Sequence, residues 1–475
     1  MQSITRILRQ PGVLPFLALL AVGVDTLGIY LYLSQRDYLL NPVWIYLTFY
    51  TALFLLYAYA GGRIIPKIDV RHTKAAAVMI VVCGVLFRAA VLPAPPSLST
   101  DMYRYVWDGK VAVHGINPYR WAPNAPQLRP LRDSMWSVTE YKAYQTIYMP
   151  VSQAFFAGNY VLFGHNLIGY KAVYASLDAG VVLMILAMLK RLKRPLTSVI
   201  WYAWCPLPIT EVALAGHQDV VGVFFLMLAF LLVVRRGSVN RIAVALTCAI
   251  LTKGFALLLI PLFWRRYGKA FLVPSIISLS ILSLPLVACL PEFLHGMQQY
   301  LKTVHVNSGL FQWMDMALSH ITVAHSQVAA MISNAAIVAV AIWSVRRPVN
   351  TDQELLRRSF IVLAATLMVV PTLFPWYLVW VTPFLCLIGR RPSWAFVLLV
   401  CLIGLLYTYY ISIQFQWWTP VLEYAPFYLV LAWEYWVWRN RRRNPDGQLP
   451  FVGDSLAQRM TMMLAEAVRQ EPNKA

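Results

Sequence analysis

Long uninterrupted apolar runs, such as residues 75–92 and 180–189, are the feature that most limits how this chain can fold. Hydrophobic residues make up 59% of the 475 positions and charged residues only 13%. A soluble domain carries about a quarter charged residues. A soluble fold could not cover so much continuous apolar surface, whereas membrane-spanning helices require it. The sequence therefore predicts an all-α polytopic membrane protein.

The alternation of apolar runs and polar breaks predicts roughly 12–14 transmembrane helices, with the N-terminus inside. The expected spans lie near residues 12–33, 43–61, 75–92, 167–189, 195–213, 220–234, 242–252, 255–264, 271–290, 327–345, 359–373, 377–388, 394–410 and 421–438. The short segments that meet near Lys253 and near Pro375 have the alternative of being half-depth hairpins. This threading divides the chain into an N-terminal three-helix membrane segment (1–92), an extracytoplasmic catalytic loop with short amphipathic helices (93–166), a polytopic bundle (167–438) with an outer loop (291–325), and a basic cytoplasmic tail (439–475).

The formal net charge of +20 invites a nucleic-acid function, but its distribution argues against one. Lys and Arg cluster at helix ends that the threading places on one side, which is the positive-inside bias that sets membrane topology. We therefore expect a multi-pass protein of the cytoplasmic (inner) membrane, embedded in membrane lipids, with no nucleic-acid partner. The six cysteines lie in or beside apolar runs without a CxxC pair, and the histidines lack ligand spacing. No metal site is predicted.

The outer segment 93–166 is long for a bare connection, and such length usually carries function. Asp101, Arg104, Tyr105 and Asp108 are spaced at offsets of three, four and seven, so a helix starting after Ser99 or Thr100 would place them on one face. A carboxylate, a cation and aromatic rings held together suit a charged, lipid-linked substrate. The alternative is an N-capped helix in an interfacial aromatic belt that includes Trp107, Tyr119 and Trp121.

A second group of polar residues lies where one predicted span ends and the next begins. Glu211, His217 and Asp219 either line an outer cavity or cap helices, and Asp219 suits a helix N-cap. Lys253 is a lone cation between two short apolar segments. It is either a functional group or a side chain that reaches to the interface.

The order of several short motifs resembles that of the polytopic GT-C glycosyltransferases, and most closely bacterial α-mannosyltransferases that use polyprenyl-phosphate mannose. The likeness runs from Arg88 onward through most of the chain. It rests on Thr100-Asp101, Tyr103-Arg104-Tyr105, Trp107-Asp108-Gly109, Gly115-Ile116-Asn117-Pro118-Tyr119, Tyr148-Met149-Pro150, Glu211 with Gly216-His217-Gln218-Asp219, Thr252-Lys253, Asn307-Ser308-Gly309 and Phe374-Pro375-Trp376-Tyr377. Many relatives carry two acidic residues where this chain has Thr100-Asp101.

The resemblance implies an inverting transfer of a sugar, with mannose expected, from a polyprenyl-phosphate donor to an extracytoplasmic glycan or glycolipid. Asp101 is the expected catalytic base, and one carboxylate suffices because the phosphate leaves as an anion without a protonating acid. Donor contacts are expected from Arg88, Arg104, Tyr105, Asp108, His217 and Lys253, and acceptor or sugar contacts from Trp107, Asn117, Tyr119, Glu211, Asp219, Asn307 and Trp376. No cofactor or divalent metal is expected.

Two other functions remain open at this stage. The same fold could use another lipid-linked sugar, such as arabinose or glucose. A transporter or flippase of lipid-linked sugars would instead place charges at mid-membrane and broken helices in two related halves. The ionisable residues here gather at the outer ends of the predicted spans, which favours chemistry at the membrane surface.

Overall fold

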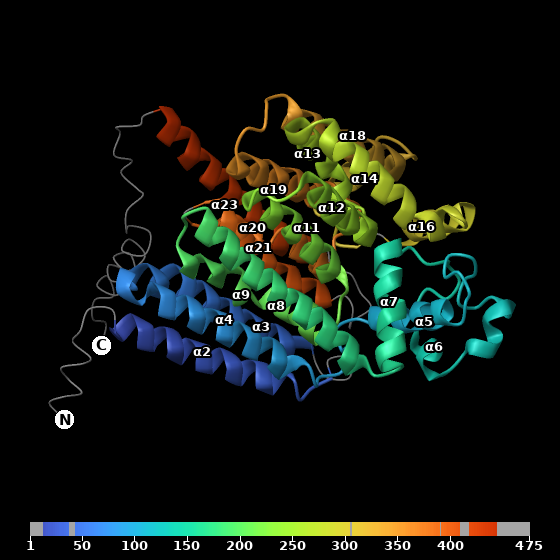
Figure 1. The fold of residues 1–475 in the computed structure, drawn as a ribbon, viewed down its shortest axis with the longest axis horizontal. Coiled ribbons are helices and arrows are strands. Elements are labelled where there is room, and N and C mark those ends of the chain that lie inside the picture. The colour runs from blue at the N-terminus through green and yellow to red at the C-terminus, as the bar shows by residue number, and fades with distance from the viewer. Residues whose placement is uncertain (1–12, 38–42, 305, 390, 409–417, 444–475) are drawn as a thin grey trace, which may run out of the picture.

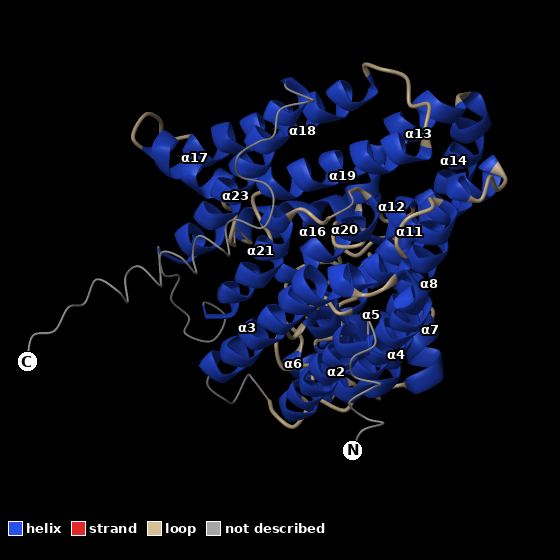
Figure 2. Cartoon of the chain, turned by 90° about the vertical axis from the view of Figure 1, so that its left-hand side faces the viewer, coloured by secondary structure: helices blue, strands red, loops and turns tan. Residues whose placement is uncertain are grey.

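The computed structural model describes residues 13–37, 43–304, 306–389, 391–408 and 418–443, and within these ranges the secondary structure is entirely helical (Figures 1 and 2). The helices are α2 (Val13–Leu33), α3 (Val43–Tyr59), α4 (Thr73–Val91), α5 (Asp101–Val113), α6 (Ser134–Val138), α7 (Pro150–Phe163), α8 (Leu167–Arg191), α9 (Ile200–Ala203), α10 (Pro206–Pro208), α11 (Asp219–Val234), α12 (Val239–Lys253), α13 (Ile260–Tyr267), α14 (Lys269–Leu282), α15 (Leu284–Val287), α16 (Leu290–Thr303), α17 (Leu310–Ser319), α18 (His325–Val345), α19 (Asp352–Val369), α20 (Phe384–Leu387), α21 (Trp394–Leu402) and α23 (Trp418–Arg443). Short 3-10 and π turns join many of them: η1 (Ala60–Ile64), η2 (Ile65–Lys67), η3 (Val70–His72), η4 (Pro126–Leu131), η5 (Leu196–Val199), η6 (Ile209–Leu214), η7 (Phe255–Leu259), η8 (Pro375–Trp380) and η9 (Ile403–Leu406).

Five helical segments of the described chain are long and apolar enough to cross a membrane: Val13–Leu33, Val43–Lys67, Val70–Val91, Leu167–Arg191 and His325–Val345. Each overlaps a span expected from the hydrophobic runs, because a long apolar helix satisfies its own backbone hydrogen bonds and suits the lipid interior. The prediction of an all-α polytopic membrane protein is therefore confirmed. The basic tail expected over 439–475 falls largely outside the described residues.

Several expected spans are broken rather than continuous. Residues 195–213 form four short turns, η5, α9, α10 and η6, instead of one helix. Pro206 and Pro208 lack the backbone N–H that a continuous helix needs, and Cys205 is extended before them (φ −60°, ψ 120°). Similarly, residues 377–388 are divided between η8 and α20. The prediction of one helix over residues 195–213 was wrong, whereas the segment after Pro375, for which a half-depth hairpin was the alternative, is a short apolar helical stretch, Pro375–Leu387.

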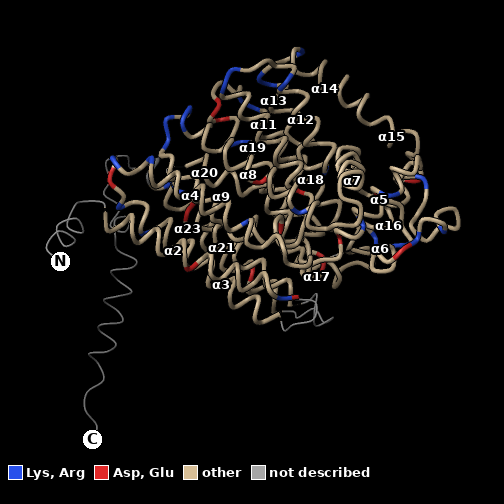
Figure 3. Tube along the Cα trace, turned by 60° about the horizontal axis from the view of Figure 1, so that its bottom comes forward, with Lys and Arg blue, Asp and Glu red and all other residues tan. Residues whose placement is uncertain are grey.

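The basic loops of the bundle meet at one end. Asp352, at the start of α19, pairs with Arg266 from the end of α13 and lies 3.5 Å from Arg236, which follows α11. Figure 3 shows Lys and Arg around α13 and the start of α14, with a further group on the segment around α5 and α6. Three of the loops that the positive-inside bias assigns to one side therefore lie together.

Residues 93–166 form a compact unit beyond the ends of α4 and α8, at the right of Figure 1, with α16 beside it. Its own small core contains Trp107, Val111 and Leu128. Helices α5 and α7 approach closely at Gly109, where a Cβ atom would lie 2.3 Å from the Phe156 carbonyl oxygen. The unit is positioned by packing rather than by a flexible linker.

Two contacts fix this unit to the bundle. The buried Lys171 ammonium on α8 donates to the carbonyls of Val91, Leu92 and Ala94 at 3.2, 2.9 and 2.7 Å, and so satisfies the C-terminal end of α4. On the other side, the buried Tyr119 ring packs against Phe293 of α16. The chain around Asp101 is therefore held before it, at residues 91–94, and after it, at Tyr119.

A buried ion pair joins α4 to α8. The Arg88 Nε lies 2.6 Å from Asp178 Oδ2, and both side chains are almost fully buried. Arg88 Nη1 also donates to the carbonyls of Gly84 and Ala203, and Tyr202 donates to Asp178. These partners account for why two charges are tolerated inside the bundle.

We expect Arg88→Met to destabilise the fold by about 3–5 kcal/mol, because it leaves the Asp178 carboxylate buried without a cation. The measurement is the midpoint of thermal unfolding in detergent. Arg88→Met combined with Asp178→Leu should recover part of the loss, and Lys190→Met, an exposed change on α8, should have little effect. A midpoint for Arg88→Met equal to that of Lys190→Met would contradict this role.

Candidate functional site

A cavity of about 330 Å³ lies where the compact unit of residues 93–166, called the outer unit below, meets the helical bundle. It is lined by the start of α5, the loop before α7, the facing ends of α11 and α12, α16, and the stretch between α19 and η8. Its ionisable carboxyl and basic side chains are Asp101, Arg104, Glu140, Asp219 and Lys253. Aromatic rings cover much of the remaining wall: Tyr105, Tyr141, Tyr144, Tyr148, Phe255, Tyr300, Phe374, Trp376 and Tyr377. Charged groups in a largely aromatic cavity are typical of a binding or catalytic site.

Asp101 is the first residue of α5, as the sequence pattern predicts, and its side chain faces the cavity. Its backbone N–H donates to Ser99 Oγ at 3.2 Å. Burial raises the pKa of the Asp101 carboxyl above its usual value, while His217, Lys253 and a hydrogen bond with Tyr148 act in the opposite direction. A carboxylate whose pKa is raised accepts a proton more readily than a free aspartate does.

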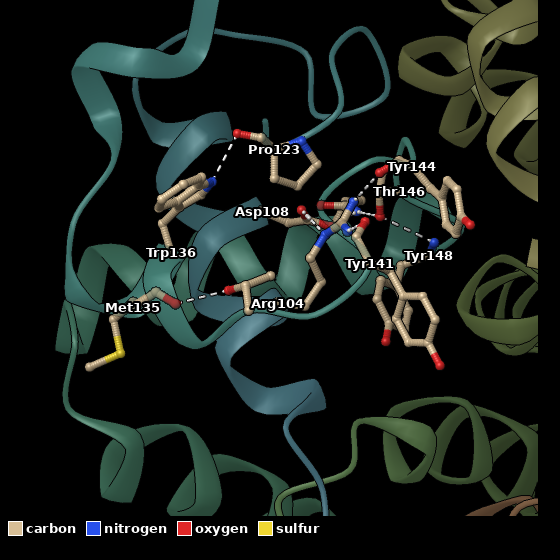
Figure 4. Close-up of polar contacts among 11 residues, drawn as sticks. Arg104, Asp108, Pro123, Met135, Trp136, Tyr141, Tyr144, Thr146 and Tyr148 are labelled. Carbon is tan, nitrogen blue, oxygen red and sulfur yellow. Dashed lines mark hydrogen bonds and ion pairs between the residues drawn. The ribbon is translucent and has the colours of Figure 1, made fainter. Parts of the chain in front are cut away.

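Arg104 and Asp108 organise the wall of the cavity (Figure 4). Arg104 Nε lies 2.8 Å from Asp108 Oδ1, and its two terminal nitrogens donate to the carbonyls of Tyr141 and Tyr144 at 3.2 and 3.1 Å. Gln153 of α7 donates to Asp108 at 3.1 Å and to Thr146 at 2.9 Å. The pair therefore holds residues 141–146 against α5 and α7, and Asp108 itself does not line the cavity.

The facing ends of α11 and α12 contribute an ion pair. Lys253 Nζ lies 2.8 Å from Asp219 Oδ1, which also accepts a hydrogen bond from Trp380 Nε1 at 3.0 Å. The ammonium lies 3.6 Å from the centre of the Tyr377 ring. Since the carboxylate and ring fix its position, Lys253 presents a preorganised cation to the cavity.

Behind this wall lies a pair formed by Glu211 and His217. His217 Nδ1 is 3.2 Å from Glu211 Oε2 and 3.0 Å from the Glu211 carbonyl oxygen. The Tyr407 hydroxyl lies 2.8 Å from each Glu211 carboxylate oxygen. The imidazole stacks on Trp376 at 3.8 Å between ring centres, so it forms a second layer beneath a ring that lines the cavity.

The structure thus brings six of the residues singled out from the sequence to the cavity wall. They are Asp101, Arg104, Tyr105, Asp219, Lys253 and Trp376. The other eight do not line the cavity. Arg88 is in its ion pair between α4 and α8, Asp108 lies behind Arg104, and Glu211 and His217 form the second layer. Trp107 is in the core of the outer unit, Asn117 and Tyr119 contact the α15–α16 region, and Asn307 is in a buried turn where its carbonyl accepts a hydrogen bond from Tyr424.

Sequence reasoning missed Glu140 and the tyrosines at positions 141, 144 and 300, all of which line the cavity. Glu140 is separated from Asp101 by about forty positions and stands in no periodic pattern, so spacing carries no signal for it. Among the described residues, no three His, Cys, Asp or Glu side chains form a cluster able to hold a metal ion.

These features define a polytopic, all-helical membrane protein with a cavity of carboxylates, a lysine and aromatic rings beside its apolar bundle. The family model described as "alpha-(1->6)-mannopyranosyltransferase, N-terminal domain" matches residues 22–266, more than half of the chain. The chain belongs to this family and is a glycosyltransferase that acts on mannose. No curated protein and no solved structure matches it.

We expect Arg104→Leu to loosen residues 139–146, because the carbonyls of Tyr141 and Tyr144 lose their charged donor. Hydrogen bonds to charged groups contribute enough that local amide exchange should accelerate about tenfold or more. Hydrogen exchange followed by mass spectrometry measures this. Arg129→Leu, an exposed change in the same outer unit, is the control. Equal exchange in both variants would contradict the anchoring role.

Proposed function

We propose that this chain is an inverting, GT-C type mannosyltransferase that moves mannose from a polyprenyl-phosphate donor to an extracytoplasmic glycan or glycolipid. The observation that carries the proposal is the Asp101 carboxyl in an aromatic cavity shared with Lys253. The Asp101 carboxylate is suited to take a proton from the acceptor, and the Lys253 ammonium is suited to hold a phosphate. The family description supports mannose as the sugar and an α-(1→6) bond as the product.

In the proposed reaction, Asp101 takes the proton of the acceptor hydroxyl as its oxygen bonds to the anomeric carbon of mannose. The bond from that carbon to the phosphate oxygen breaks, and the phosphate leaves with the electron pair. Attack from the face opposite the phosphate inverts the anomeric centre, so a β-linked donor gives an α-linked product. Asp101 is the one base that this step needs.

The charge that develops on the leaving phosphate needs a positioned cation. Lys253 supplies it in this proposal, with Asp219 and the Tyr377 ring holding the ammonium in place. A single phosphate leaves as an anion that one or two such groups can balance. We therefore propose a reaction without a divalent metal or other cofactor.

We place the protein in the cytoplasmic membrane with its cavity on the extracytoplasmic side. The cavity lies at the start of α11 and the end of α12, whereas the basic loop that contains Arg235 and Arg236 joins the opposite ends of these helices. Since basic loops favour the cytoplasmic side, this arrangement supports an outward cavity. Nucleotide sugars are confined to the cytoplasm, so an outward site requires a lipid-linked donor.

Asp101→Asn keeps the size of the side chain but removes its ability to accept a proton. We expect kcat to fall by about 10²–10⁴-fold with little change in KM for the donor. Transfer of labelled mannose from a polyprenyl-phosphate donor in proteoliposomes measures this. Unchanged turnover would refute the assignment of Asp101. Translocation of the lipid-linked sugar without a new glycosidic bond would refute the enzyme class.

The pH dependence offers a second test of Asp101. Because burial raises the pKa of this carboxyl, it becomes protonated at a higher pH than a free aspartate, whose pKa is about 3.9. We expect kcat/KM to fall as pH decreases through this raised pKa. The Lys253 charge lowers the pKa of Asp101, so Lys253→Met should move the acidic limb further upward in pH. A limb that stays in place or moves downward would contradict the proposed contact.

A further inference from the structure

The segment 139–146 carries a carboxylate and several rings to the cavity that contains Asp101. Glu140, Tyr141 and Tyr144 all line the cavity, and the Glu140 side chain is exposed, which places it where the cavity opens. Asp101 lines the same cavity. A second carboxyl group is therefore present in the cavity of the proposed base.

The backbone here is held in an unusual conformation. Tyr141 has φ +52°, a region that residues other than glycine rarely adopt and that costs about 1–3 kcal/mol. The Arg104 guanidinium binds the carbonyls on both sides of this bend, and the Tyr144 N–H donates to the Tyr141 carbonyl at 3.1 Å. Such a conformation persists only where the surroundings enforce it, and Glu140, Tyr141 and Tyr144 all line the cavity on either side of it.

The chemistry of this wall differs from that around Lys253. Tyr141 and Tyr144 stack with 6.2 Å between ring centres, and the Tyr300 ring lies 6.4 Å from that of Tyr141. Flat aromatic faces pack against the apolar face of a sugar ring, and a carboxylate accepts hydrogen bonds from its hydroxyls. A carboxylate also repels an anionic ligand, so this wall suits a neutral, hydroxyl-rich ligand rather than a phosphate.

We propose that Glu140, with Tyr141 and Tyr144, forms the acceptor subsite and binds the hydroxyls of a neutral glycan. This assignment rests on the proposed function. Glu140 orients the acceptor so that its reacting hydroxyl lies against Asp101, while the donor phosphate lies toward Lys253. Glu140 is a binding and specificity residue here, and Asp101 remains the base.

The test uses the full chain in proteoliposomes, with mannosyl phosphate of a short isoprenoid alcohol as donor and octyl α-mannopyranoside as acceptor. Glu140→Gln should raise KM for the octyl mannoside about tenfold or more, with kcat and donor KM within about twofold of wild type. The KM of Glu140→Asp, which keeps the charge, should lie between the KM of wild type and that of Glu140→Gln. Glu292→Gln on α16, an acidic residue outside the cavity, is the matched control.

Transfer of mannose to water depends on Asp101 and the donor site but not on glycan binding, so we expect its rate in Glu140→Gln to stay within about twofold of wild type. An acceptor KM that does not rise, or that rises equally in Glu292→Gln, overturns the subsite. A loss of kcat and of transfer to water, as expected for Asp101→Asn, also overturns it. If the wild-type chain transfers no mannose at all, the proposed function fails and this assignment fails with it.

Discussion

Backbone that leaves a helix inside an apolar bundle must still satisfy its N–H and C=O groups, and membrane proteins meet this requirement only where such backbone is buried in protein or borders a cavity. Three interruptions in this chain border the same cavity. They are the turn between η6 and α11, the bend at Gly254 after α12, and the extended stretch at 370–374 after α19. Their free groups find partners, for example His217 N–H with the Glu211 carbonyl and Leu373 N–H with the Val306 carbonyl. The broken helices therefore create the site.

The same interruptions explain why Asp219 and Lys253 can remain charged at the cavity. Asp219 begins α11 and Lys253 ends α12, so each lies at the helix terminus whose partial charge is opposite to its own. Their ion pair adds the Trp380 indole as a further donor. Groups held in this way need little reorganisation when a substrate charge develops nearby, which is the basis of electrostatic catalysis.

The fold could be predicted from the sequence wherever one physical requirement dominated. The spans that became α2, α3, α4, α8 and α18 followed from uninterrupted hydrophobic length. The start of α5 at Asp101 followed from its spacing with Arg104, Tyr105 and Asp108. The four turns at 196–214 did not, because hydropathy averages over a window and is insensitive to where prolines interrupt it. Local composition predicts that a segment is buried, but not that it is helical.

The candidate site was less accessible to the same reasoning. Arg88 was expected at the donor phosphate, yet its guanidinium is bonded to Asp178, ninety positions away. Glu140 attracted no attention because it stands in no periodic pattern, and only the folding of the loop brings it to the cavity. Helical periodicity finds residues that share a face. Residues that meet from different elements carry no periodic signal.

The resemblance stated from the sequence implies two acidic residues where this chain has Thr100-Asp101, and the physical question is what a second one would do. A phosphate leaving group needs no protonation, so a second carboxylate is not required as an acid. In the proposed arrangement Glu140 lines the same cavity as Thr100 and Asp101 and holds the acceptor instead. A carboxylate from the loop can serve that purpose without being at position 100, because binding a hydroxyl depends on where the oxygen atoms lie and not on which helix supplies them. On this view proton transfer and acceptor binding are divided between two carboxylates of this chain, with the first assigned to Asp101 and the second to Glu140.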